Sequence, residues 1–147
     1  MNSADAWFEP PMRLERIRVD NFKSLVDFEL QLAPFTCLIG LNGAGKSTVL
    51  QAIDFAAQLF RGDIDGWLAH RGWQVADLGS KLTKRSNIAI ELWLSAGPTR
   101  FHWSGAFNRA RRRCTREQLS INGESRFTVG NQRYDFPLRA CVLPLLP

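Results

Sequence analysis

Residues 35–48 have the sequence FTCLIGLNGAGKST, and the rest of the chain is best understood from this stretch. Its first part is apolar and short, which predicts a buried strand over 35–39. The glycines at 40, 43 and 45 predict a tight turn, because a residue without a Cβ adopts left-handed backbone angles at little cost. A helix is predicted from Ser47 onward. The order of strand, glycine-rich turn and helix fits the pattern G-x-x-x-x-G-K-[ST] from Gly40 to Ser47.

Each residue type in this pattern suits the binding of a phosphate chain. Backbone amides of the turn can point inward around an anion, and the following helix presents its unpaired N–H groups to the same anion. Lys46 supplies a positive charge for the β- and γ-phosphates, the hydroxyl of Ser47 suits Mg²⁺, and Thr48 can contact the α-phosphate. A chance match to the pattern is the alternative, which the flanking strand and helix disfavour. The predicted nucleotide-binding residues are Gly40, Leu41, Asn42, Gly43, Ala44, Gly45, Lys46, Ser47 and Thr48.

The composition is that of a soluble globular domain. The 147 residues are 45% hydrophobic and 22% charged, which excludes an intrinsically disordered chain. The net charge of +5 permits a polyanionic partner without requiring one. The chain has no signal-peptide pattern and no apolar run long enough to span a membrane. Three widely spaced cysteines predict a reducing, cytoplasmic setting, with Cys37 packed in the strand as a small hydrophobic residue.

The first half of the chain predicts the core of an α/β domain. Residues 1–11 are expected to form a flexible leader, and residues 12–147 are expected to form one partial domain. Within 12–60, strands are expected at 13–19, 26–32 and 35–39, followed by a helix over 47–60. The apolar face of this helix is expected to contain Leu50, Ile53, Ala57 and Phe60.

The second half predicts an antiparallel meander. A connecting segment over 61–86 contains a short helix around Ile64, Trp67 and Leu68. Asn122-Gly123 is the clearest hairpin signal, because both residues tolerate the positive φ angles of a two-residue turn. The strands expected within 87–147 are at 88–94, 100–107, 118–121, 125–129, 134–136 and 140–143.

Together with residues 35–53, the sequence RIRVDNFKSL at 16–25 resembles the N-terminal lobe of an ABC-type ATPase head. The nearest branch is the RecF/SMC-like group of AAA family ATPases of DNA repair and phage defence, and the resemblance is specific over residues 13 to 60. It implies that the turn with Lys23 and Ser24 lies beside the nucleotide. It also implies ATP and Mg²⁺ as ligands, a C-terminal lobe or a second head in a homo- or heterodimer as partner, and DNA as a further partner.

Two motifs that hydrolysis needs in this family are missing from the sequence. The apolar run at 88–91 ends in Glu91, but the alternation continues beyond it, so Glu91 is expected to face solvent rather than complete a magnesium site. The run LSING at 119–123 resembles the L-S-G-G-Q signature in letters, but its glycine belongs to a hairpin turn. We therefore assign no catalytic residue. We expect a truncated domain that binds ATP and hydrolyses it poorly until another lobe completes the site.

A basic cluster in the second half supports a different class of function. The functional interpretation is a patch for nucleic-acid phosphates, and the alternative is a solvated hairpin face. On the first interpretation, the protein is a non-catalytic nucleotide- or nucleic-acid-binding module. A P-loop kinase or GTPase is disfavoured, because it needs alternating helices and parallel strands after the loop. The cluster consists of Arg109, Arg111, Arg112, Arg113 and Arg116.

Overall fold

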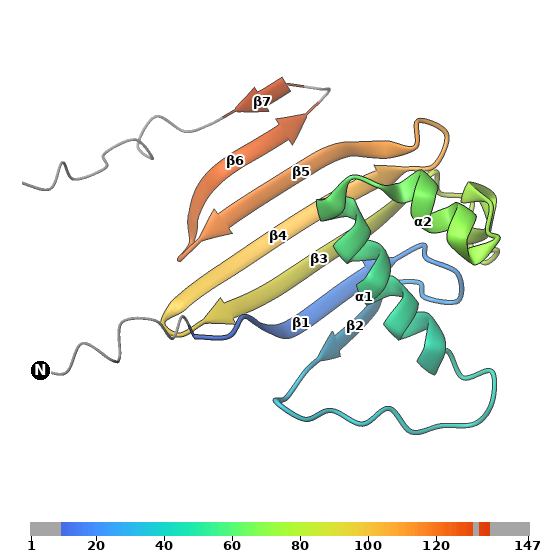
Figure 1. The fold of residues 1–147 in the computed structure, drawn as a ribbon, viewed down its shortest axis with the longest axis horizontal. Coiled ribbons are helices and arrows are strands. Elements are labelled where there is room, and N and C mark those ends of the chain that lie inside the picture. The colour runs from blue at the N-terminus through green and yellow to red at the C-terminus, as the bar shows by residue number, and fades with distance from the viewer. Residues whose placement is uncertain (1–9, 131–132, 136–147) are drawn as a thin grey trace, which may run out of the picture.

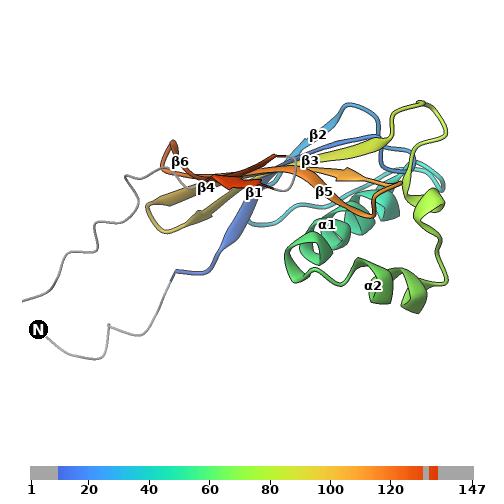
Figure 2. The same cartoon turned by 90° about the horizontal axis from the view of Figure 1, so that it is seen from above.

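An antiparallel sheet with two helices against one face makes up the part of the chain that the computed structural model describes, residues 10–130 and 133–135. Over these residues the sheet has seven strands in the order β2-β1-β3-β4-β5-β6-β7 (Figure 1). Figure 2 shows α1 and α2 on the same side of the sheet. The elements are β1 Arg13–Asp20, β2 Phe28–Gln31, α1 Lys46–Arg61, α2 Ile64–Arg71, the 3-10 helix η2 Val75–Leu78, β3 Asn87–Ala96, β4 Thr99–Asn108, β5 Arg113–Ile121, β6 Glu124–Gly130 and β7 Arg133–Asp135.

The hydrophobic core lies between the sheet and α1. Alternate residues of the central strands point toward the helix, because successive side chains of a strand point to opposite faces. Gly105 of β4 makes room for one of them, since a Cβ there would lie 2.4 Å from the ring of Trp103. The buried strand residues of this core include Ile17, Val19, Ile88, Ile90, Trp103 and Phe107.

The α/β class and the antiparallel meander of the second half are confirmed. The strands expected at 13–19, 88–94 and 100–107 correspond to β1, β3 and β4. The Asn122-Gly123 hairpin joins β5 to β6, with φ angles of 51° and 82°. The strand expected at 134–136 corresponds to β7. Residues 1–9 of the expected leader and the expected strand at 140–143 lie outside the described residues.

The strand expected at 35–39 is wrong. These residues have no regular secondary structure, Phe35 and Ile39 are 85% and 90% exposed, and Cys37 is exposed rather than packed. In the described part of the chain no strand runs beside this segment, which passes outside the sheet beyond β2 (Figure 1). A strand needs a hydrogen-bonding neighbour, so the apolar pattern alone does not produce one.

The expected apolar face of α1 is also wrong, except for Ile53, which packs against the core. The helix buries Val49, Ala52, Phe55 and Ala56, while Leu50 and Phe60 are 63% and 57% exposed. The expected and the observed sets of apolar residues both form a row with helical spacing. The observed row brings two alanines against the sheet, and small side chains let a helix approach its neighbour closely.

Asp54 ties α1 to α2. Its carboxylate accepts hydrogen bonds from Trp67 Nε1 at 2.9 Å and Gln58 Nε2 at 3.2 Å, and it pairs with Arg71. Burial alone would raise the pKa of Asp54, but these hydrogen bonds outweigh burial and lower it.

Replacing Asp54 with Asn is expected to lower the free energy of unfolding by about 1 to 2 kcal/mol at neutral pH. A lowered carboxyl pKa stabilises the fold above the unfolded-state pKa, and this contribution is lost as the pH falls through the folded-state pKa. The difference between the wild type and Asp54→Asn should therefore shrink in acid. Urea unfolding at pH 7 and pH 3, followed by tryptophan fluorescence, measures it. Glu29→Gln, in an exposed ion pair with Arg16, is the control and should cost less than about 0.5 kcal/mol. An undiminished difference at pH 3 would contradict this role.

Candidate functional site

The glycine-rich loop leads directly into α1. Gly43 and Gly45 have φ angles of 83° and 85°, in the region that side chains with a Cβ avoid. Gly45 is the N-cap residue of the helix. Gly40 has no such requirement, and a Cβ there would meet Ala44 Cβ at 3.4 Å. Two of the three loop glycines are therefore needed by the backbone conformation itself.

Lys46 is the first residue of α1, and its side chain folds back over the loop. Its Nζ donates hydrogen bonds to the carbonyl oxygens of Gly40 at 2.5 Å and Leu41 at 2.7 Å. The first turn of α1 contains this lysine and no acidic residue. A cation at a helix N-terminus is unfavourable for the helix, since both have the same sign. An anion bound at this position would offset that repulsion.

The turn between β1 and β2 lies against the start of α1. Ser24 Oγ is 3.3 Å from Thr48 Oγ1, and a Cβ on Gly45 would lie 3.4 Å from Ser24 Oγ. Lys23 Nζ donates to Gln51 Oε1 at 3.0 Å, one turn further along the helix. The structure thus brings Lys23 and Ser24 to the helix that follows the glycine-rich loop.

The ammonium group of Lys23 also lies over an aromatic ring. Its Nζ is 3.2 Å from the centroid of the Trp73 ring, a cation–π contact. Burial is the main reason that the pKa of Lys23 lies below its ordinary value; Asp77 opposes this shift and Arg71 adds to it. The sequence pattern did not single out Trp73 or Gln51. Gln51 follows Lys46 by five residues, but nothing in the sequence indicates that it meets Lys23.

A magnesium ion would find one protein ligand in this loop. Ser47 lies exposed in the first turn of α1. Among the described residues no group of three or more His, Cys, Asp and Glu side chains could hold a metal ion. In P-loop sites Mg²⁺ is held by the loop Ser or Thr together with an Asp and phosphate oxygens, so the hydroxyl of Ser47 would supply one of these ligands.

Three arginines of the predicted basic cluster have different surroundings. Arg109 donates to the Arg85 carbonyl oxygen at 2.8 Å, and Arg112 pairs with Asp65 of α2 at 2.7 Å. Arg116 lies opposite Ala106 in the sheet and lines the face turned away from the helices.

The remaining two arginines of the cluster, Arg111 and Arg113, lie in the β4–β5 connection and at the start of β5. Arg111 is exposed in the turn, where its backbone N–H donates to Asn108 Oδ1 at 2.9 Å. Arg113 begins β5 opposite Asn108. The nucleic-acid interpretation of this cluster stays a prediction.

Glu91 and residues 119–123, which we did not assign as catalytic motifs from the sequence, have structural roles. Glu91 pairs with Arg18 at 3.8 Å, and its Oε2 lies 3.2 Å from His102 Nε2 on the sheet face away from the helices. Its side chain is 32% exposed, as expected for a residue that faces solvent. Residues 119–123 form the end of β5 and the hairpin turn, so they begin no helix.

Comparison with known families matches residues 12–91, more than half of the chain, to the AAA ATPase domain. The chain belongs to this family. An OLD nuclease from Thermus scotoductus is 38% identical over 111 residues, 76% of this chain and 18% of that protein. The DNA replication and repair protein RecF from Pseudarthrobacter chlorophenolicus is 32% identical over 114 residues, 75% of this chain and 28% of that protein.

A solved structure supports the same assignment at the level of the fold. The recombination mediator protein RecF with ATPrS superposes with a TM-score of 0.51 at 23% identity, covering 80% of this chain and 28% of that one. The resemblance to an N-terminal lobe of a RecF/SMC-like ATPase is confirmed. The chain spans less than a third of the length of each of these relatives. In the part that the structure describes, neither helix of this AAA ATPase domain has the length and apolar character to cross a membrane.

Proposed function

We propose that this chain binds ATP with Mg²⁺ through residues 40–48, as the N-terminal part of a longer ATPase. The observation that carries the proposal is the position of the Lys46 ammonium group, 2.5 Å from the Gly40 carbonyl oxygen at the N-terminus of α1. The first turn of this helix contains no acidic residue. An ammonium group in this place, above a loop with two left-handed glycines, suits the β- and γ-phosphates of a nucleotide.

Each group of the loop has a separate task in this proposal. The backbone N–H groups at the start of α1 bind phosphate oxygens, and Lys46 neutralises their charge. Ser47 orients the magnesium ion and Thr48 contacts the α-phosphate. Ser24, at 3.3 Å from Thr48, and Lys23 beside it form the second wall of the site.

We further propose that a second lobe or head covers the loop side of α1. Phe35, Ile39 and Leu41 are at least 85% exposed, and Leu50 on the adjacent helix turn is 63% exposed. Neighbouring exposed apolar side chains are typical of an interaction surface. The relatives are more than three times as long as the part that this chain matches, which supports a partner lobe of the same protein. Hydrolysis needs metal and water positioning that we expect the second lobe or head to complete, so turnover is proposed for the assembled protein.

Titration with a fluorescent ATP analogue tests the binding proposal. Saturable binding that strengthens with Mg²⁺ is expected, together with phosphate release by this chain that barely exceeds the buffer rate. An absence of saturable binding in the presence of Mg²⁺ would refute the proposal.

A role in DNA transactions is proposed for the assembled protein. The support is that one relative is named as a nuclease and another as a DNA replication and repair protein. The net charge of +5 is compatible with such a partner.

The basic cluster around the β4–β5 connection is not expected to be the DNA-binding surface. Replacing Arg111, Arg112 and Arg113 with Gln should change the slope of log K against log salt for duplex DNA by less than about one unit, because Arg112 is held by Asp65. Fluorescence anisotropy measures the slope between about 50 and 200 mM salt, a range that includes physiological ionic strength. Lys81→Gln with Lys84→Gln controls for the loss of two of these three charges. A slope lowered by about two or three units would instead identify the basic cluster as the DNA-binding module.

A further inference from the structure

We propose that Asn21 is a positioning residue for the nucleotide site. It holds the turn over residues 22–25 in place, and this turn presents Lys23 and Ser24 to the start of α1. The inference rests on the proposed nucleotide binding and adds a residue that does not itself touch the loop.

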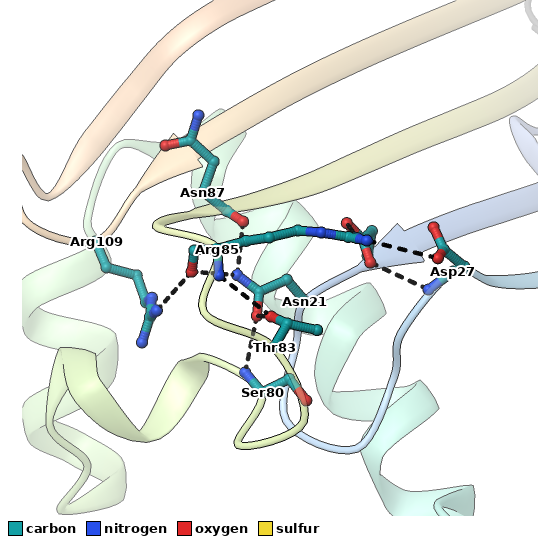
Figure 3. Close-up of polar contacts among 8 residues, drawn as sticks. Asn21, Asp27, Ser80, Thr83, Arg85, Asn87 and Arg109 are labelled. Carbon is teal, nitrogen blue, oxygen red and sulfur yellow. Dashed lines mark hydrogen bonds and ion pairs between the residues drawn. The ribbon is translucent and has the colours of Figure 1, made fainter.

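Asn21 uses every hydrogen-bonding group of its buried side chain. The residue is 0% exposed. Its Nδ2 donates to the carbonyl oxygens of Arg85 at 2.8 Å and Asn87 at 2.7 Å. Its Oδ1 accepts from Ser80 N at 3.2 Å and from Thr83 Oγ1 at 2.6 Å (Figure 3). The side-chain amide of Asn21 therefore binds segment 80–87 at four positions next to the end of β1.

Backbone contacts also join residues 21–23 to residues 78–80. Lys23 N donates to the Leu78 carbonyl oxygen at 2.9 Å, Ser80 N lies 3.3 Å from the Asn21 carbonyl oxygen, and Phe22 forms a β-bridge with Gly79. Asn21 and Lys23 have φ angles of 62° and 50°. Left-handed conformations are costly for residues with a side chain, so surrounding contacts must maintain this turn.

The other side of the turn faces the nucleotide site. Phe22 is fully buried and stacks on Phe55 of α1 with ring centroids 5.3 Å apart. Next to it, Lys23 Nζ reaches Gln51, and Ser24 Oγ reaches Thr48. A shift of the turn would therefore move both candidate contacts relative to the helix start. The segment that contains Asn21's partners thus braces the site from a distance.

An asparagine is the residue that fits this position. Its amide offers two donors for the two carbonyl groups and an acceptor for the two donors, which a carboxylate cannot match. Asparagine also tolerates positive φ better than most residues with a Cβ. The Arg85 carbonyl group accepts a second bond, from Arg109 Nη2 at 2.8 Å, so this brace extends to the β4–β5 connection (Figure 3).

Asn21→Gly tests the proposal, because glycine adopts the same φ angle and removes all four side-chain hydrogen bonds. We expect the Kd for a fluorescent ATP analogue to rise about tenfold in protein that is shown to be folded by circular dichroism. Asn122→Gly is the matched control. Asn122 has a φ angle of 51° and its Oδ1 accepts from Arg100 N at 2.8 Å, but it lies in the β5–β6 turn. Its replacement should leave the Kd within about twofold of the wild type.

A double substitution separates positioning from general stabilisation. If Asn21 acts through Lys23 and Ser24, then Asn21→Gly should raise the Kd by less than about twofold in a protein that already has Lys23→Ala and Ser24→Ala. An Asn21→Gly protein that melts earlier but, when folded, binds the analogue as tightly as the wild type would overturn the proposal. So would an undiminished tenfold effect in the doubly substituted background.

A milder substitution covers the case in which Asn21→Gly does not fold. Thr83→Val removes the 2.6 Å hydrogen bond to Asn21 Oδ1, together with the longer bond of 3.4 Å that Thr83 Oγ1 accepts from Arg85 N within the same segment. It should raise the Kd about threefold. An unchanged Kd would overturn the proposal. Failure of the nucleotide proposal itself has a different signature, because then the wild-type protein shows no saturable binding.

Discussion

Lys46→Ala is expected to raise the Kd for ATP by at least about 100-fold, which removes measurable binding at ordinary concentrations. The ammonium group already lies 2.5 and 2.7 Å from the carbonyl oxygens of Gly40 and Leu41, so it needs little reorganisation to meet a phosphate. Its loss leaves the phosphate charge to backbone N–H groups alone. Isothermal titration calorimetry with Mg²⁺ and ATP measures the change.

A matched lysine shows whether this effect is local. Lys84→Ala removes an exposed lysine from the segment before β3 and should leave the Kd within about twofold of the wild type. Circular dichroism of both variants checks that α1 still forms. Equal affinity of Lys46→Ala and the wild type would exclude the loop as the phosphate site.

Phe55→Ala is expected to have the largest effect on stability, a loss of about 3 to 5 kcal/mol. Phe55 is 0% exposed. Its ring lies 5.3 Å from those of Phe22 and Phe107 and 5.7 Å from that of Trp67, measured between centroids. It therefore joins α1 to the β1–β2 turn, to α2 and to the sheet. Since small domains are stable by about 5 to 15 kcal/mol, the variant should be close to unfolding.

An exposed phenylalanine provides the control for this substitution. Phe35 is 85% exposed, so Phe35→Ala should change the free energy of unfolding by less than about 0.5 kcal/mol. Urea unfolding followed by circular dichroism compares the two variants. A similar loss for both would contradict the role of Phe55 in the core.

Elements with a strong local signal were predictable. Alternation of apolar and polar residues identified β2 and β3, and Asn122-Gly123 identified the β5–β6 hairpin. The spacing of the glycines and Lys46 identified the loop and the helix after it. These signals depend on backbone preferences within a few residues, which the order of amino acids states directly.

Elements that depend on distant partners were not predictable. The apolar run at 35–39 has the composition of a strand but no neighbouring strand in the described residues, so it stays irregular and exposed. In α1 two apolar rows have helical spacing, and contact with the sheet selected the one that contains Ala52 and Ala56. Among the five arginines at 109–116, which are close in sequence, Arg109 and Arg112 are directed to different partners, the Arg85 carbonyl oxygen and Asp65.

The amino-acid order was sufficient for the glycine-rich loop and for membership of the AAA ATPase domain, because that loop is a local backbone arrangement defined by two glycines and a lysine. Folding in three dimensions was needed to bring Asn21, Lys23 and Ser24 into one unit with segment 78–87 and α1. These contacts join residues that are 24 to 66 positions apart. Such pairs have no spacing rule, since they form only where the sheet and the helix pack together.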